Sequence, residues 1–183
     1  MTVNKKIFLF IAILFFITGF FLSIKPIYFY SKGILFQEFA GIYWNINNKS
    51  CTKKSDNFFV GRLTIPGINL DNVVLNGTDN TTLSLGPGLF RSNFNNNYIV
   101  IAGHRDSFFK KNKNINLDDL IIFEDECSKH DYKVIDILSY VEPNDMSYFN
   151  SKNKDFLVLI TCFPFDFIGP APYRYLVIAE KVI

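Results

Sequence analysis

Hydrophobic positions at the start of the chain form one long uninterrupted run. Residues Ile7 to Ile24 (IFLFIAILFFITGFFLSI) carry no charge and follow directly after Lys5 and Lys6. As a helix rising about 1.5 Å per residue, the run spans about 27 Å, close to the ~30 Å of bilayer hydrocarbon. It is apolar on every side, whereas a helix in a soluble core carries a polar stripe. We therefore predict a transmembrane helix over residues 7–24.

The flanks of this run favour an uncleaved signal anchor. A cleavable signal peptide has a shorter apolar region and ends in a small-x-small cleavage site, but this run ends in Ser23-Ile24-Lys25-Pro26. The preceding lysines favour a cytoplasmic location for residues 1–6, because positive flanks tend to stay inside. We expect a single pass through the plasma membrane, with the rest of the chain outside the cell.

Two further segments separate this anchor from the body of the chain. Between Tyr28 and Trp44, apolar residues recur with the spacing of an amphipathic helix. Residues 45–57 are polar and have no period, which is typical of a linker or surface loop. We assign residues 25–57 to a juxtamembrane helix and linker, and residues 58–183 to a folded body.

The body has the pattern of a mainly β protein. Its apolar runs are short, rich in Val, Ile, Phe and Tyr, and bounded by Gly, Pro, Asn and Asp. The predicted strands are Phe59–Ile65, Asn72–Leu75, Tyr98–Ala102, Leu120–Phe123, Tyr132–Tyr140, Phe156–Thr161 and Tyr175–Lys181, with brief helices near Thr81–Leu85 and Asn116–Leu120. Several short strands separated by turn signals indicate a β-sandwich or a small closed barrel.

Composition and motifs exclude several classes of function. The 183 residues suit one domain with an appendage, and 49% hydrophobic residues exclude a disordered chain. A net charge of +2 gives no reason to expect a nucleic-acid partner. The chain has no CxxC, no histidine pair at helical spacing and no phosphate-binding glycine motif. The acidic run Glu124-Asp125-Glu126 is more typical of a solvated turn. We expect neither a metal nor a cofactor.

Two residues at strand ends are candidates for nucleophilic catalysis. Cys162 ends the apolar strand before Phe163-Pro164, and His104 follows Gly103 at the end of another. A thiolate is a strong nucleophile, and a nearby imidazole can lower the thiol pKa or relay its proton. The local pattern is equally compatible with a buried structural cysteine and a structural histidine.

The other cysteines and one arginine complete the set of candidates. Arg174 opens the last predicted strand in a chain that otherwise favours lysine, and a guanidinium near the thiol can hold an oxyanion. Cys51 lies in the predicted linker and Cys127 in a polar turn. Because three is an odd number, at least one thiol is free or pairs outside the chain; whether Cys51 and Cys127 are bridged stays open. His130, in a polar turn, is interpreted as solvated.

Three groups of residues, in a fixed order, resemble a known family. They are Leu63-Thr64-Ile65-Pro66-Gly67-Ile68 with Gly77 and Leu83-x-x-Gly86-Pro87-Gly88, then Ala102-Gly103-His104-Arg105-Asp106 with Phe108-Phe109, then Leu159-Ile160-Thr161-Cys162-Phe163-Pro164-Phe165 with Gly169-x-Ala171-Pro172-x-Arg174. From about Phe58 to Ile183 the chain resembles a sortase, a membrane-anchored cysteine transpeptidase of mainly Gram-positive bacteria. The His-Arg-Asp and Thr-Cys-x-Pro-Phe forms are most similar to class D.

The resemblance implies a fold, a reaction and partners. The fold is a sortase-like eight-stranded β-barrel with short helices, preceded by one N-terminal transmembrane helix. The reaction cleaves a C-terminal sorting signal resembling Leu-Pro-x-Thr-Gly between Thr and Gly, through a thioacyl-enzyme intermediate. The surface protein is then joined to a peptidoglycan precursor or another surface amine.

The resemblance also implies a role for each site residue. Cys162 is the nucleophile, His104 the acid and base, Arg174 the group that steadies the oxyanion or the substrate backbone, and Thr161 lines the substrate groove. Two alternatives remain from the residues alone. One is an extracellular cysteine peptidase that only hydrolyses, and the other is a non-catalytic anchored module that binds surface-protein tails.

Overall fold

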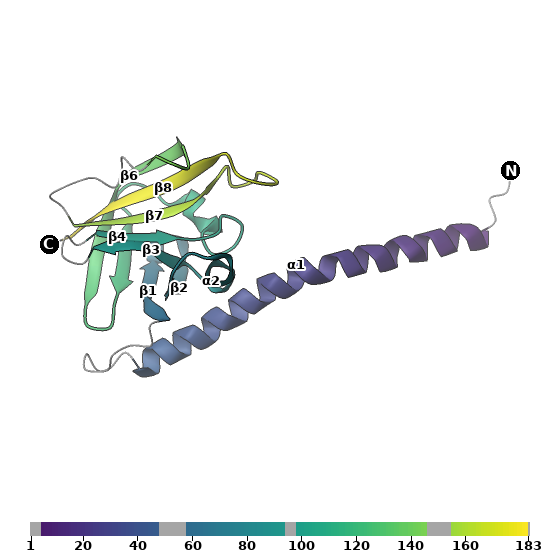
Figure 1. Cartoon of the computed structure of the whole chain (residues 1–183), viewed down its shortest axis with the longest axis horizontal. Helices are drawn as coiled ribbons and strands as arrows, with labels where there is room; N and C mark the ends of the chain where they lie inside the picture. Colours follow the sequence, from purple (N-terminus) through teal and green to yellow (C-terminus); the bar gives the residue numbers. More distant parts are fainter. Residues whose placement is uncertain (1–4, 48–57, 94–97, 146–154, 183) are drawn as a thin grey trace.

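The computed structural model describes residues 5–47, 58–93, 98–145 and 155–182 as a β-barrel beside one long helix (Figure 1). Eight strands close in the order β1-β2-β3-β4-β7-β8-β6-β5. They are β1 (Phe59–Ile65), β2 (Leu70–Asn76), β3 (Gly88–Asn93), β4 (Tyr98–Ala102), β5 (Leu120–Glu124), β6 (Lys129–Val141), β7 (Phe156–Phe163) and β8 (Tyr173–Lys181). The helical elements are α1 (Lys5–Asn47), α2 (Asn80–Leu85), η1 (Pro66–Ile68) and η3 (Lys110–Asn114). The predicted eight-stranded barrel is confirmed.

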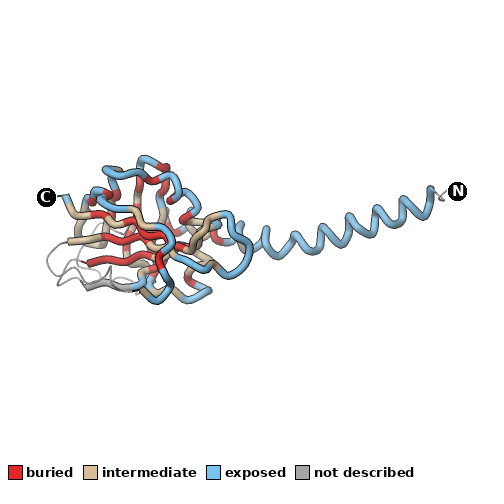
Figure 2. The backbone as a smooth tube through the Cα atoms, turned by 90° about the horizontal axis from the view of Figure 1, so that it is seen from above, coloured by how far each residue is buried: buried red, intermediate tan, exposed pale blue. Residues whose placement is uncertain are grey.

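The helix α1 joins the two N-terminal helices that the sequence predicted. It runs from Lys5 through Pro26 to Asn47 without a break. In the part of the chain that the structure describes, it is the helix that is long and apolar enough to cross a membrane. Figure 2 shows it exposed along its N-terminal half and partly buried only beside the barrel. The exposed apolar half is consistent with a membrane anchor, because water would not solvate such a surface favourably.

The C-terminal half of α1 packs against β2 and α2. Ala40 and Trp44 are buried against Val73 of β2. The side chain of Gln37 donates to the carbonyls of Val73 (3.2 Å) and Leu85 (3.0 Å) and accepts from the Val73 amide (2.8 Å). Gly33 allows the close approach, because a Cβ there would lie 2.7 Å from the carbonyl oxygen of Ser84. The anchor helix therefore has a defined position on the barrel.

Strand alternation gives the barrel an inner and an outer apolar face near β7. Leu157 and Leu159 point into the large cluster that fills the barrel interior. The residues between and beside them, Val158 and Ile160, pack in a second cluster with Val100 of β4 on the opposite face. Side chains of β7 with even numbers therefore share the outer face, which includes position 162.

Two local predictions were wrong. The helix expected at Asn116–Leu120 is a turn, because Asp118 has a positive φ of 70° and the carboxylate of Asp119 accepts from the Asn116 amide at 2.8 Å. The short helix lies earlier, at Lys110–Asn114. The strand β3 was not predicted, since its sequence (GLFRSN) has neither a continuous apolar run nor a clear alternation.

Tyr132 on β6 leads us to expect a loss of stability above pH 10. Its ring is buried, and burial, together with the negative charges of Asp155 and Asp125, raises its pKa to about 12. A raised tyrosine pKa means that the folded state keeps a proton which the unfolded chain releases. The stabilisation is therefore complete below pH 10 and falls by about 2–3 kcal/mol between pH 10 and 12.

The measurement is denaturant unfolding of the detergent-solubilised chain, followed by near-ultraviolet circular dichroism at pH 8, 10 and 11. Tyr132→Phe keeps the ring and removes the titrating hydroxyl, so its stability should fall less over this range. Equal pH slopes for the variant and the parent would contradict the prediction.

Candidate active site

Cys162 and Arg174 occupy directly opposed positions on neighbouring strands. In the antiparallel pair β7 and β8, the register aligns Cys162 with Arg174, and Ile160 with Leu176. Opposed residues of an antiparallel pair project from the same face, with Cβ atoms typically about 4.5–5.5 Å apart. Both side chains are half-buried. The register thus brings a thiol and a guanidinium to one face of the barrel.

His104 reaches the same end of the sheet from β4. The strands β4 and β7 are parallel, and Ala102 aligns with Ile160. The Gly103 amide continues the pairing by donating to the Ile160 carbonyl at 3.1 Å. Extending this register by two residues brings His104 level with Cys162. The predicted trio therefore comes together at the carboxyl ends of β4 and β7 and the start of β8.

Thr161 lies in a different place from the one expected. It is only 3% exposed, and its hydroxyl donates to the Gly103 carbonyl at 2.7 Å. Because it alternates with Cys162 along β7, its side chain faces the opposite side of the strand. This contact ties the residue before Cys162 to the residue before His104. Thr161 is thus placed to hold two strand ends together rather than to touch a substrate in a groove.

Gly103 is required by close packing at this junction. A Cβ on Gly103 would lie 2.7 Å from the ring of Phe109, which is fully buried in the barrel core. On the β7 side, the rings of Phe163, Phe165 and Tyr175 pack with centroids 5.0–6.0 Å apart. Burial raises the pKa of Tyr175. These aromatic contacts support the strand ends from inside.

Arg105 holds the loop between β7 and β8. Its guanidinium donates to the carbonyls of Phe167 (2.7 Å) and Gly169 (2.8 Å), and it lies 5.8 Å from the centre of the Phe167 ring. The sequence analysis gave Arg105 no role of its own. Both hydrogen bonds come from the same nitrogen, Nη2. Arg105 joins the residue after His104 to the loop that follows Cys162.

The guanidinium of Arg174 rests on the backbone of the same loop. It donates to the carbonyl of Tyr173 at 3.0 Å and contacts that of Ala171 at 3.4 Å. These are neutral acceptors, so the positive charge is not neutralised by a carboxylate among the described residues. An arginine so placed can turn toward negative charge that develops at a neighbouring thioester carbonyl.

The remaining cysteines and histidine lie elsewhere. Cys162 is a free thiol, whereas Cys127 is disulfide-bonded; Cys51 lies outside the described residues. The imidazole of His130 contacts the hydroxyl of Ser128 at 2.8 Å, in a turn where the Asp125 carboxylate accepts from the amides of Cys127 and Ser128. No group of three possible metal ligands was found in the described ranges.

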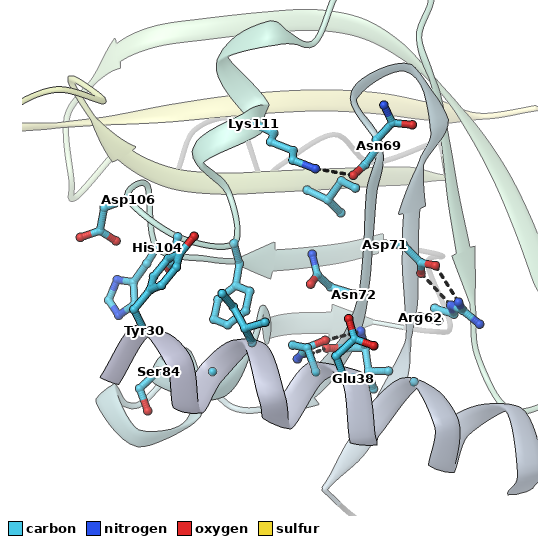
Figure 3. Close-up of a pocket in the computed structure, with 18 of the residues that line it drawn as sticks. Tyr30, Glu38, Arg62, Asn69, Asp71, Asn72, Ser84, His104, Asp106 and Lys111 are labelled. Atoms are coloured by element: carbon cyan, nitrogen blue, oxygen red, sulfur yellow. Dashed lines mark hydrogen bonds and ion pairs between the residues drawn. The ribbon is translucent and has the colours of Figure 1, made fainter. Parts of the chain in front are cut away.

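A groove separates α1 from the barrel and reaches His104. Its cavity measures about 1020 Å³ and is lined by α1, by β1 and β2, and by the segment after β4. Figure 3 shows Tyr30 and Asp106 close to His104 at one end, and the Arg62–Asp71 ion pair at the other. Hydrogen bonds from Arg62 lower the pKa of Asp71, and the pKa of Arg62 is raised in return. Cys162 and Arg174 do not line this groove.

Comparison with known proteins identifies the family to which this fold and site belong. Residues 63–182 match the Sortase domain family. Sortase D of Bacillus subtilis (strain 168) is 30% identical over 139 residues, which are 74% of this chain and 70% of that protein.

Solved structures share the fold. A Clostridium perfringens Sortase D5 transpeptidase superposes with a TM-score of 0.65 at 19% identity, over 84% of this chain and 99% of that one. Sortase A from Corynebacterium diphtheriae gives a TM-score of 0.64 at 24% identity, over 78% and 69%. The chain belongs to the sortase family and is similar to sortase D. It is thus a cysteine transpeptidase of the class that anchors surface proteins.

Proposed function

We propose that the protein is a membrane-anchored sortase in which Cys162 is the nucleophile. The observation that supports this proposal is the register, which opposes Cys162 to Arg174 and pairs the strand before His104 with the strand that contains Cys162. Cys162 is a half-exposed free thiol at a strand end. A reactive thiol needs access to substrate and a polar partner, and this position supplies both.

The proposed substrate is a C-terminal sorting signal resembling Leu-Pro-x-Thr-Gly. The sulfur attacks the carbonyl carbon of the Thr–Gly bond, and Arg174 steadies the oxyanion or the substrate backbone. His104 gives a proton to the departing glycine amine, which leaves a thioester on Cys162. Because the thioester conserves the energy of the cleaved peptide bond, the reaction needs no nucleotide cofactor. Thr161 positions the two strand ends through Gly103.

In the second half of the reaction an amine resolves the thioester. His104 takes a proton from the incoming amine, the new amide forms, and the thiol is restored. The proposed acceptor is a peptidoglycan precursor or another surface protein. The class D-like motifs around His104 and Cys162, together with the similarity to sortase D, support the assignment of the chain to a class D-like sortase.

The proposed location is the outer face of the plasma membrane. Residues 1–6 lie in the cytoplasm, residues 7–24 cross the bilayer, residues 25–57 form the juxtamembrane segment, and residues 58–183 form the catalytic domain. The exposed apolar half of α1 and the lysines before it support this orientation. Docking of α1 through Gln37 keeps the barrel beside the end of the membrane helix.

The test is an assay of the full chain in detergent with a panel of Leu-Pro-x-Thr-Gly-like peptides. Each peptide is incubated with and without triglycine or a diamino acid, and the products are identified by mass spectrometry. An amide product that requires the amine supports the proposed function. Cleavage that is indifferent to every amine would instead assign an extracellular cysteine peptidase. A folded protein that forms neither a thioacyl enzyme nor a product would assign a binding module.

A further inference from the structure

We propose that the groove between α1 and the barrel binds the incoming acceptor, a peptide that presents a primary ammonium group. The inference rests on the proposed function and assigns its second substrate to a surface. The groove is about 1020 Å³ in volume, large enough to hold several residues of an extended peptide. One of its walls is the juxtamembrane part of α1, so the anchor helix takes part in the site.

The position of His104 connects this groove to the reaction. Of the three proposed catalytic residues, His104 lines the groove, whereas Cys162 and Arg174 do not. In acyl transfer the incoming amine takes the path of the leaving amine, and the same imidazole serves both. An acceptor must therefore approach Cys162 from the side of His104. The groove reaches this residue.

Two carboxylates favour a bound cation in the groove, one beside His104 and one farther along α1. Asp106 lies beside His104, and Glu38 points from α1 toward the strands (Figure 3). Neither carboxylate has an ion-pair partner among the described residues. Arg62 is paired with Asp71, whereas Lys111 donates to the neutral Asn69 carbonyl at 2.6 Å and keeps its positive charge. Three carboxylates (Glu38, Asp71 and Asp106) and two cations line the groove, which leaves one net negative charge. Two free carboxylates in a concave site raise the local concentration of an ammonium group.

The groove also opens where a membrane-held acceptor would arrive. Pro26 and Ile27, which directly follow the apolar run of α1, line it at the same helix end as Tyr30. The end of the groove that contains His104 is therefore the end nearest the apolar run of α1.

The step balances without a further reactant. The bound ammonium group loses one proton to solvent, and the resulting amine nitrogen attacks the thioester carbonyl carbon. The C–N bond forms, the C–S bond breaks, and the second proton of the nitrogen passes through His104 to the Cys162 sulfur. The products are an amide and a free thiol.

The experiment compares two acceptors with the full chain in detergent micelles. Triglycine amide carries an ammonium group, whereas hydroxylamine is uncharged at neutral pH. The double variant Glu38→Gln, Asp106→Asn should raise the KM for triglycine amide about tenfold, because each lost carboxylate weakens binding by a few-fold. The KM for hydroxylamine should stay within twofold. In the parent enzyme, 0.5 M NaCl should raise the KM for triglycine amide toward that of the variant.

A matched control and four possible outcomes separate the explanations. Asp131→Asn removes an exposed carboxylate of β6 outside the groove and should change neither KM. Equal increases for both acceptors would indicate a structural defect and overturn the proposal. A higher KM for the sorting peptide, with the acceptor KM unchanged, would assign the groove to the leaving segment and also overturn it. A normal thioacyl enzyme with an unchanged acceptor KM overturns the groove alone, whereas absence of a thioacyl enzyme in the parent overturns the proposed function.

Discussion

Replacing Cys162 with alanine is expected to remove the thioacyl enzyme and to lower amide formation by at least about 10⁴-fold, because the reaction would lose its proposed nucleophile. The barrel should stay folded. Cys162 is half-exposed at the end of β7, so the lost sulfur costs less than about 1 kcal/mol of unfolding free energy. Intact mass spectrometry after incubation with a sorting peptide detects the acyl adduct, and denaturant unfolding checks the fold.

Labelling of the Cys162 thiol in the parent protein tests the same assignment without a substitution. In the part of the chain that the structure describes, Cys162 is the free thiol and Cys127 is disulfide-bonded. Iodoacetamide should therefore modify the peptide that contains Cys162 and block activity in the same proportion. Product formation by a folded Cys162→Ala protein at the parental rate would refute the assignment of this nucleophile.

Replacing Arg174 with alanine is expected to lower kcat about 10²- to 10³-fold, the usual cost of losing one oxyanion donor. Arg174→Lys should recover little of this loss. Arg174 lies opposite Cys162, and its Nη1 contacts the backbone carbonyls of Ala171 and Tyr173. The other guanidinium nitrogens stay available for a substrate oxygen, in a fixed planar geometry that an ammonium group does not reproduce. Single-turnover formation of the thioacyl enzyme measures the effect on the first chemical step.

The control for Arg174 is Lys133→Ala. Lys133 is an exposed cation on β6, and it pairs with the Asp118 carboxylate at 2.8 Å. This variant should keep the parental kcat. If Arg174→Lys were as active as the parent, charge alone would account for the role of residue 174. The argument that the guanidinium geometry is needed would then be wrong.

The local sequence pattern was sufficient to predict a helix or strand where burial or exposure of apolar side chains dominates the segment. The apolar run from Ile7 to Ile24 predicts its helix because every side must be compatible with the same apolar surroundings. The strands β1 and β4 begin and end where predicted, because β1 alternates between buried and partly exposed positions and β4 is a short continuous buried run. The turn at Asp118 and the strand β3 were missed, since a side-chain hydrogen bond or a neighbouring strand decides such polar segments.

The candidate site, too, could be predicted only in part from the sequence. Motif resemblance predicted Cys162, His104 and Arg174 as the catalytic residues, but it carried no information on their relative positions. Thr161 shows the limit of inference from proximity in sequence. It was expected to line the groove beside Cys162, yet strand alternation turns it inward to the Gly103 carbonyl.

By itself the sequence determined the long apolar N-terminal helix, the β-rich body and the chemical types available for catalysis, because these depend on local hydrophobicity and on side-chain chemistry. Only the tertiary structure decided that β4 and β7 lie side by side, that Arg174 is opposed to Cys162, and that α1 forms one wall of a groove ending at His104. These relations join residues more than fifty positions apart, or belong to the register of a strand pair. They follow from the closure of the barrel and the docking of α1 at Gln37, which no local stretch of the chain encodes.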